Sequence, residues 1–406
     1  MSSTDIHDSR YSWIRLGITL AIGMVANVGM WAVIVIMPAF EAEFGASRAM
    51  TSMPYTLTMI GFALGNLLIG RMVDRFGVTV ALIGAAVGIA AGFTLATFAT
   101  SFAMLTVAHL LLGLFTAVGF GPLIADISHW FLKRRGIAVA LAASGNYLSG
   151  AIWPTLLAGM LDESGWRQVY LTLALITLVV LIPLAFLLRR KVPETAHGLA
   201  EAASALKARS VGFSPRTLQY LLGLAGIGCC VAMSMPQVHI VAYCVGLGYG
   251  PAVGAEMLSL MLVGGVVSRV ISGLVADKLG GVMTLLAGSV LQCIALFLYL
   301  PYDGMASLYM VSMIFGLAQG GIVPSYALIV REYMPAKEAG ARVGFVMMMT
   351  ILGMALGGWM SGWIYDVSGS YHWAFLNGIV WNGLNIAIMI MLLMRSRPRT
   401  PRAVPA

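Results

Sequence analysis

Two stretches of the chain follow one pattern: residues 70–77 are GRMVDRFG and residues 273–280 are GLVADKLG. Both fit the pattern G-x-x-x-D-[RK]-x-G, and they begin 203 positions apart. A second pair of related stretches, residues 162–165 and 366–369, has almost the same offset, and each begins with Asp and ends with Gly. Repetition at a fixed interval is typical of a duplicated structural unit. We therefore predict two halves that are built from the same set of elements.

The composition shows what these elements are. The chain has 406 residues, of which 60% are hydrophobic and 10% are charged, and its mean hydropathy is +0.91. Globular domains carry about 25% charged residues. This composition excludes a soluble, disordered or collagen-like chain and indicates an integral membrane protein. There is no P-loop, no nucleophile elbow and no metal-ligand spacing among the four cysteines, so we expect no enzyme, no cofactor and no bound metal.

A membrane helix needs roughly 20 apolar residues. The sequence contains twelve such stretches, six on each side of a polar segment, and we find no cleavable signal peptide before the first. We predict an all-α membrane protein in which twelve helices form two pseudo-symmetric six-helix bundles, residues 1–188 and 217–406, joined by a loop, 189–216. The predicted spans are 14–38, 52–72, 78–99, 103–128, 136–160, 168–188, 217–243, 253–276, 281–301, 305–330, 341–365 and 373–394.

The basic residues predict the orientation. With the N-terminus inside, 21 of the 24 Lys and Arg residues fall on the cytoplasmic side, Arg48 and Arg167 fall outside, and Arg269 falls within a span. This asymmetry follows the positive-inside rule. The net charge of +8 then faces anionic lipid and needs no nucleic acid as a partner. We expect a monomer in a bacterial inner membrane, with both termini in the cytoplasm.

With its two motifs, twelve spans and central loop, the chain resembles the major facilitator superfamily over nearly its whole length. A narrower resemblance is to the monocarboxylate and oxalate/formate branch, which carries an aromatic pair, a basic cluster and then a small-residue helix. Here these are Trp130-Phe131, residues 133–135 and residues 143–145. The resemblance implies a carrier that works by alternating access, in which the two halves rock about a central site.

Arg269 is the candidate that most strongly indicates a substrate class. It lies eight residues before Asp277, which places it about 12 Å inside the membrane. Burying an unpaired guanidinium costs at least about 2.5–3.5 kcal/mol, so a partner is required. A carboxylate substrate fits its fork of donors, whereas Asp126 is the alternative partner in a purely structural salt bridge. The resemblance also implies an arginine in span eight, but this chain has Gly265 where the animal carriers place an aspartate, and no lysine in span one.

Other polar residues in the predicted spans complete the candidate site, and we expect Tyr326 and Asn146 to form a carboxylate clamp with Arg269. Each of them is also explained by ordinary helix packing. The candidate substrate-binding residues are Arg269, Tyr326, Asn146, Tyr147, Asn27 and Gln237. The candidate gating residues are Gly70, Arg71, Asp74, Arg75, Gly77, Asp277 and Asp126. The candidate proton carriers are His239, His129 and Glu256.

We therefore predict a secondary carrier of small organic anions, with monocarboxylates such as lactate or pyruvate as the first candidates and protons as the candidate coupling ion. Two alternatives stay open. A drug or cation exporter of the same fold would need an acidic residue in the cavity, for which Asp126 is the deep candidate. A dicarboxylate or anion exchanger would use the same arginine.

Overall fold

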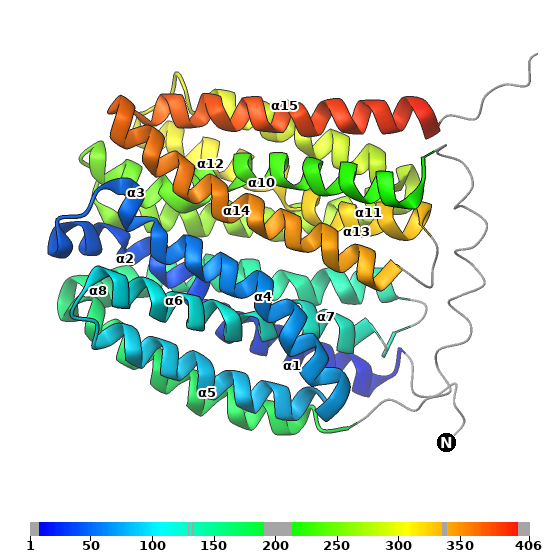
Figure 1. Cartoon of the computed structure of the whole chain (residues 1–406), viewed down its shortest axis with the longest axis horizontal. Coiled ribbons are helices and arrows are strands. Elements are labelled where there is room, and N and C mark those ends of the chain that lie inside the picture. Colours follow the sequence, from blue (N-terminus) through cyan, green and yellow to red (C-terminus); the bar gives the residue numbers. More distant parts are fainter. Residues whose placement is uncertain (1–7, 129, 132–133, 191–212, 335–338, 397–406) are drawn as a thin grey trace, which may run out of the picture.

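The computed structural model describes residues 8–128, 130–131, 134–190, 213–334 and 339–396. In these ranges the chain forms helices joined by short turns, with no β-strand. The helices lie side by side along the long axis of the molecule (Figure 1). In the first half they are α1 (Arg10–Ala26), α2 (Val28–Phe44), α3 (Arg48–Thr51), α4 (Met53–Phe76), α5 (Val78–Thr97), α6 (Phe102–Thr116), a 3-10 turn (Ala117–Gly119), α7 (Gly121–Ser128) and α8 (Arg135–Leu187). In the second half they are α10 (Pro215–Gly246), α11 (Pro251–Leu298), α12 (Met305–Gln319), α13 (Ile322–Tyr333), α14 (Ala339–Ser368) and α15 (Tyr371–Ser396).

The number of membrane crossings agrees with the sequence. Eleven helical segments within the described residues are long and apolar enough to span a bilayer. One of them, Ile137–Leu187, has 51 residues, which is about 75 Å of helix and far more than one crossing needs. The chain turns back within this segment at Gly165, whose φ of +73° is open to glycine but strained for other residues. The eleven segments therefore make twelve crossings, as predicted.

The backbone itself repeats between the two halves. Gly77 and Gly280, the last residues of the two related motifs, have φ/ψ values of 85°/162° and 80°/166°. Two further pairs of glycines with positive φ are Gly45 with Gly248 and Gly165 with Gly369, and they are 203 and 204 positions apart. The same turns therefore recur at the same interval along the chain, which supports the predicted pseudo-symmetry of the two bundles.

The two ends of the bundle differ. The start of α1 and the end of α15 lie at one end, which we call the terminal face, while α3 lies at the other end, the opposite face (Figure 1). An even number of crossings requires this arrangement. Arg48 and Arg167 lie on the opposite face, in α3 and next to the Gly165 turn. Most of the remaining described arginines and lysines are at helix ends on the terminal face.

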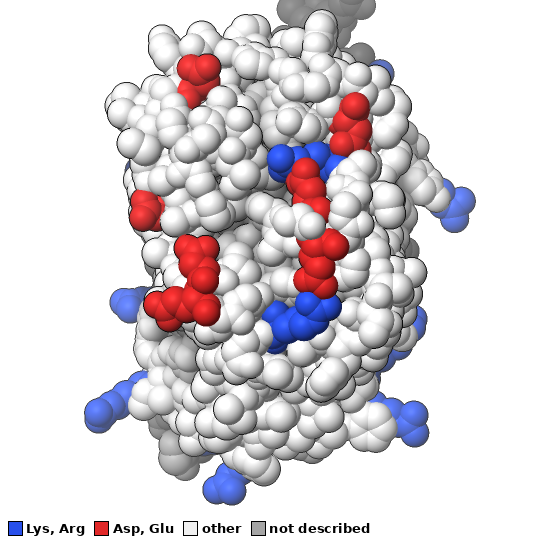
Figure 2. All heavy atoms as spheres, turned by 90° about the vertical axis from the view of Figure 1, so that its left-hand side faces the viewer, with Lys and Arg blue, Asp and Glu red and all other residues white. Residues whose placement is uncertain are grey.

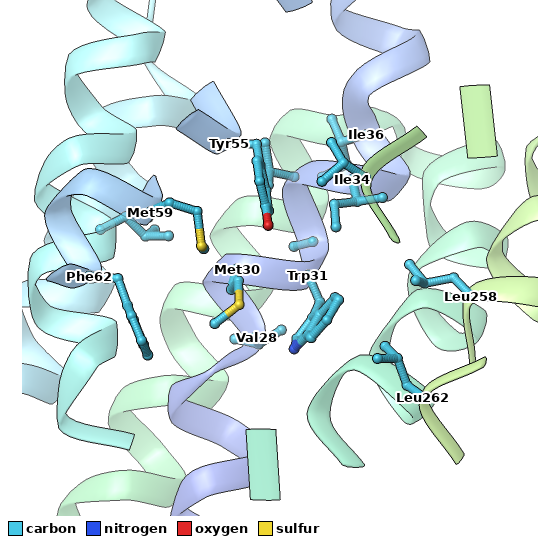
Figure 3. Packing of buried hydrophobic residues seen from close by; sticks show 14 of the residues in the cluster. Val28, Met30, Trp31, Ile34, Ile36, Tyr55, Met59, Phe62, Leu258 and Leu262 are labelled. Atoms are coloured by element: carbon cyan, nitrogen blue, oxygen red, sulfur yellow. The ribbon is translucent and has the colours of Figure 1, made fainter. Parts of the chain in front are cut away.

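Apolar side chains join the two halves along α2. The view in Figure 3 shows α2 between two neighbours, with Met30 on the side of Met59 and Trp31 on the side of Leu258 and Leu262 of α11. Trp31 is 1% exposed, and a Cβ atom at Gly150 would meet both its ring and the Leu262 side chain within 2.6 Å. The small residue is therefore what lets α8, α2 and α11 pack closely at the interface of the halves.

Candidate functional site

Arg269 lies on α11 where the two halves meet. Its side chain is buried, with 4% of the residue exposed, so it does not reach the lipid headgroups. Its Nη1 donates to the carbonyl oxygen of Ala143 on α8 at 2.6 Å, and its Nε donates to the carbonyl oxygen of Gly320 at 3.3 Å. The guanidinium therefore bridges the first and the second half of the chain.

No carboxylate in the described part of the chain neutralises this charge. Among the described residues, no Asp or Glu oxygen lies within 4.0 Å of Arg269, and its two hydrogen-bond acceptors are uncharged carbonyl groups. The centre of the Tyr147 ring lies 3.9 Å from the Arg269 Cζ, and such a stacked pair contributes about 0.5–2 kcal/mol. That is less than the cost of an isolated buried charge. An anion that enters this region would therefore meet an arginine that no described acid already pairs.

Gly265 is what makes room for the stacked ring. A Cβ atom at this position would lie 2.6 Å from two ring carbons of Tyr147, which is too close for any side chain. Gly265 is one helical turn before Arg269, so the ring that fills this space also covers the guanidinium. The glycine that departs from the pattern of the animal carriers thus has a structural reason: tyrosine occupies the volume that an aspartate side chain would need.

Asn27 and Asn146 form a second polar group, at breaks in two helices. Asn27 separates α1 from α2, and its Nδ2 donates to the carbonyl oxygens of Gly23 at 2.7 Å and Gly119 at 3.0 Å. Asn146 donates to Asn27 Oδ1 at 3.0 Å, and the Trp31 indole donates to the Asn146 carbonyl at 3.0 Å. Side chains therefore satisfy the carbonyl groups freed by the two breaks, as buried backbone in a membrane requires.

Tyr326 does not join the predicted clamp. Its hydroxyl is buried and donates to Asn385 Oδ1 at 2.8 Å, within a polar group formed by α13 and α15. The Asn146 amide bonds to Asn27 rather than to Arg269. The side chain that contacts Arg269 is Tyr147, the neighbour of Asn146. The expectation that Tyr326 and Asn146 complete a clamp on Arg269 is thus corrected, because other side chains already occupy their polar atoms.

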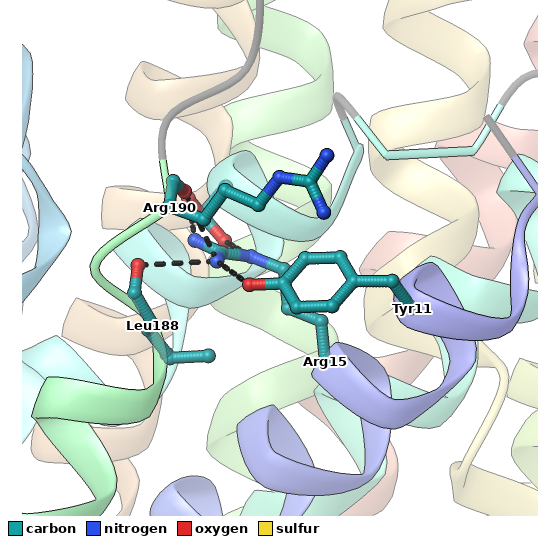
Figure 4. A network of polar contacts seen from close by, with 5 residues as sticks. Tyr11, Arg15, Leu188 and Arg190 are labelled. Carbon is teal, nitrogen blue, oxygen red and sulfur yellow. Dashed lines mark hydrogen bonds and ion pairs between the residues drawn. The ribbon is translucent and has the colours of Figure 1, made fainter. Parts of the chain in front are cut away.

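Asp126 is paired with Arg15 and not with Arg269. Its two oxygens accept from Arg15 Nε and Nη2, both at 2.8 Å, in the two-pronged geometry that carboxylates form with arginine. Arg15 also donates to the Leu188 and Arg190 carbonyl oxygens and to the Tyr11 hydroxyl (Figure 4). The structural alternative for Arg269 is therefore wrong. Arg15, which the count of basic residues assigns to the cytoplasmic side, is also enclosed by protein, since its side chain is 1% exposed.

The first motif lies at the end of α4, on the terminal face. Gly77 makes the turn into α5, and Arg75 lies over the Phe76 ring at 5.2 Å. Arg71 is exposed, and a Cβ atom at Gly70 would meet no other atom within 4 Å. The side chains of Asp74 and Asp277 lie outside the described part of the structure. The role of this motif as a latch therefore stays a prediction.

The candidate proton carriers occupy different regions. His239 is buried on α10, with Nε2 donating to the Gly358 carbonyl at 2.7 Å and Nδ1 lying 3.1 Å from the Tyr371 hydroxyl. Glu256 accepts a hydrogen bond from the Tyr309 hydroxyl near the opposite face. His129 lies outside the described residues. His239 therefore remains as the candidate that contacts several helices of the second half.

Charged residues close the opposite face. Figure 2 shows acidic and basic side chains next to one another along the centre of this face. Arg167 Nη2 lies 2.7 Å from Glu43, and Arg48 Nε lies 3.0 Å from Glu41. The Asp366 carboxylate at the end of α14 accepts from the backbone N–H groups of Arg48 at 2.9 Å and Ala49 at 2.8 Å. Asp366 thus joins the second half to the first, a contact that the sequence analysis did not identify.

Comparison with known proteins agrees with this architecture. The family model described as Major Facilitator Superfamily matches residues 19–301 and, in a second alignment, 245–406. The chain belongs to the major facilitator superfamily. It is therefore a multi-pass membrane transporter, not an enzyme.

Curated relatives narrow the comparison. Bovine (Bos taurus) monocarboxylate transporter 13 is 28% identical over 88% of this chain and 82% of its own length. Human (Homo sapiens) monocarboxylate transporter 11 is 26% identical over 91% of this chain and 80% of its own length. The MFS-type transporter pynF of Aspergillus niger is 27% identical over 77% of this chain and 72% of its own length. The predicted resemblance to the monocarboxylate branch is confirmed.

Proposed function

We propose that this transporter carries small organic anions, and in particular monocarboxylates such as lactate or pyruvate, across the membrane. The observation that carries the proposal is the buried Arg269, which has no carboxylate partner among the described residues and stacks on Tyr147. An arginine binds a carboxylate through two parallel hydrogen bonds. The names of the mammalian relatives, which describe monocarboxylate transporters, support the same class.

The two alternatives differ in what they require. A cation exporter needs a free acidic group in its path, and Asp126, the deep candidate, is held by Arg15 in a two-pronged pair. An anion exchanger would use Arg269 in the same way as a uniporter or symporter. Exchange is distinguished by loading proteoliposomes with unlabelled anion and measuring whether uptake then accelerates.

The test is a panel of carboxylates. Purified protein is heated with mono- and dicarboxylates and with organic cations, and uptake of the ligands that raise Tm is measured in proteoliposomes. We expect short monocarboxylates to raise Tm and to be taken up. A protein that responded to cations alone would contradict the proposal.

We propose protons as the coupling ion, with His239, His129 and Glu256 as candidate carriers. Among these, His239 connects α10 to both α14 and α15 through its two ring nitrogens. Its protonation would therefore change contacts between three helices of the second half. Uptake that ignores an imposed pH gradient, together with no alkalinisation of the outside medium, would refute symport.

We propose that the bundles 1–188 and 217–406 rock about Arg269, with residues 189–216 as their cytoplasmic connection. In the conformation described here, Asp366 holds the opposite face closed. In the alternate conformation, the terminal face is held closed by the motif residues Gly70, Arg71, Asp74, Arg75, Gly77 and Asp277. By the positive-inside rule the terminal face is cytoplasmic. We further propose that the protein works as a monomer in a bacterial inner membrane.

Replacing Asp366 with alanine should increase the population of the conformation in which the opposite face is open. The variant loses two bonds from a charged acceptor to the backbone of α3, each worth about 1.5–3 kcal/mol, so the population of the open state should rise at least about tenfold. The measurement is the rate at which an impermeant maleimide labels Thr56→Cys, which faces the Ala355 carbonyl across the interface, in a background without native cysteines. The control is Asp162→Ala, the exposed repeat-related aspartate, which should leave the rate unchanged. Equal rates in both variants would contradict the latch.

Replacing Gly265 with alanine should weaken carboxylate binding about tenfold. The new methyl group would lie 2.6 Å from the Tyr147 ring and push it off the guanidinium, which removes a contribution of about 0.5–2 kcal/mol and turns the arginine. Gly159→Ala, on α8 with open space around it, is the matched control. Binding is measured by calorimetry, and unchanged affinity in Gly265→Ala would show that the stacked ring has no part in the site.

A further inference from the structure

Two buried glutamines face one another next to Arg269. Gln237 on α10 is 1% exposed and Gln319 at the end of α12 is fully buried. Gln237 Nε2 donates to Gln319 Oε1 at 2.7 Å. A buried amide–amide contact of this kind joins the first helix of the second half to the helix that carries the Gly320 break.

This contact leaves polar atoms unpaired. Gln237 Oε1 and Gln319 Nε2 are both sealed from solvent and have no hydrogen-bond partner in the described part of the chain. An unsatisfied buried polar group costs about 1–3 kcal/mol. Turning either amide over does not remove the problem, because a single bond between two amides always leaves one carbonyl oxygen and one NH2 group unused.

The pair belongs to the same region as the arginine. Gln319 precedes Gly320, whose carbonyl oxygen accepts from Arg269 Nε. On α10, Met233 lies one helical turn before Gln237, and its sulfur lies 3.9 Å from the Tyr147 hydroxyl. Arg269, Tyr147 and the amide pair therefore lie close together where the two halves meet.

The corresponding break in the first half is arranged differently. There Asn27 donates to the Gly119 carbonyl and accepts from Asn146, while the buried Thr116 hydroxyl, 203 positions before Gln319, has no partner among the described residues. No polar atom of Asn27 or Asn146 is left buried and unpaired. In the described part of the chain, a pair of amides with unpaired atoms thus occurs at the break in the second half, on the side of Arg269.

We propose, building on the proposed function, that Gln237 and Gln319 determine specificity by binding a hydroxyl group on the carboxylate substrate. A hydroxyl donates one hydrogen bond and accepts others, so it satisfies Gln237 Oε1 and Gln319 Nε2 together. A keto oxygen accepts from Gln319 alone and leaves Gln237 Oε1 unpaired. A methylene group satisfies neither amide, and it seals both from water.

The test uses three acids with the same carbon skeleton: 2-hydroxypropanoate, 2-oxopropanoate and propanoate. Their affinities for the purified full-length protein are measured by calorimetry. We expect the hydroxy acid to bind about 10–100-fold more tightly than propanoate, with the keto acid between them, since each unsatisfied amide costs about 1–3 kcal/mol. Equal affinities for the three acids would overturn the inference while leaving the carboxylate proposal intact. Failure of all three acids to bind would overturn both.

Substitutions of Gln237 and Gln319 test whether this pair causes the preference for the hydroxy acid. Gln237→Met and Gln319→Met keep the volume and remove the amides, so we expect each to lose most of the preference for the hydroxy acid over propanoate. The matched control is Gln292→Met, which removes another buried glutamine of the same half with an unpaired Oε1. A preference that persists in both pair variants, or is lost equally in the control, contradicts the assignment. The comparison of the three acids on wild-type protein decides the case if a variant does not fold.

Discussion

Replacing Arg269 with lysine should leave the helix bundle folded and remove most of its affinity for carboxylates. Lysine keeps the positive charge and much of the length, so the electrostatic attraction of the site for anions persists. It cannot hold the Ala143 and Gly320 carbonyl groups and still offer two parallel N–H groups to a carboxylate. It also lacks the planar group that stacks on Tyr147.

The expected loss is about 10–150-fold in affinity, which corresponds to the 1.5–3 kcal/mol of a charge-assisted hydrogen bond. The measurement is calorimetric titration with the tightest acid of the panel, with Tm recorded without ligand to check folding. Arg167→Lys is the matched control, since that arginine is 44% exposed on the opposite face and should tolerate the change. If Arg269→Lys bound carboxylates as tightly as the wild type, the cargo would have to be held elsewhere.

The position of Arg269 could be predicted because a charged side chain within an apolar span is costly and needs a binding partner. Arg269 is indeed buried at the interface of the halves. The sequence could not show which neighbours reach it. Asn146 and Tyr147 are adjacent in sequence, but only Tyr147 stacks on the guanidinium, because the helix turns each side chain by about 100° from the one before it.

The fold was predictable for a related reason. Periodic apolar stretches and repeated turn glycines act locally, so twelve crossings and a duplicated unit could be found from spacing alone. Contacts such as Asp366 with the α3 backbone depend on how two distant segments pack. The Gln237–Gln319 pair is similar, since only the structure shows that two ordinary glutamines meet and leave atoms unpaired.

Arg15 shows what the count of basic residues could not reveal. The count assigns this arginine a side of the membrane but no partner. In the structure α1 begins at Arg10, so Arg15 is already in its second turn and is enclosed by Asp126 and the Trp130 ring, 4.7 Å away. The Leu188 and Arg190 carbonyl groups complete its shell. The arginine thereby fixes the start of the 189–216 connection to the first helix.

Replacing Asp126 with asparagine should destabilise the protein more than any other substitution considered for the first half. Arg15 would keep its charge in a site where it is 1% exposed and would lose its only acidic partner among the described residues. Removing one member of a buried pair costs about 3–5 kcal/mol, which should appear as a large fall in Tm. Glu43→Gln breaks the exposed pair with Arg167 and should cost about 1 kcal/mol or less.

A double variant separates stability from anchoring. Arg15→Met with Asp126→Leu removes both charges, and apolar replacements of buried pairs are often neutral, so most of the lost Tm should return. The Leu188 and Arg190 carbonyl groups would still lack their donor, which should let trypsin cut after Arg189 and Arg190 faster than in the wild type. A normal Tm for Asp126→Asn would show that this pair does not stabilise the fold. Unchanged trypsin cleavage in the double variant would show that Arg15 does not anchor the connection.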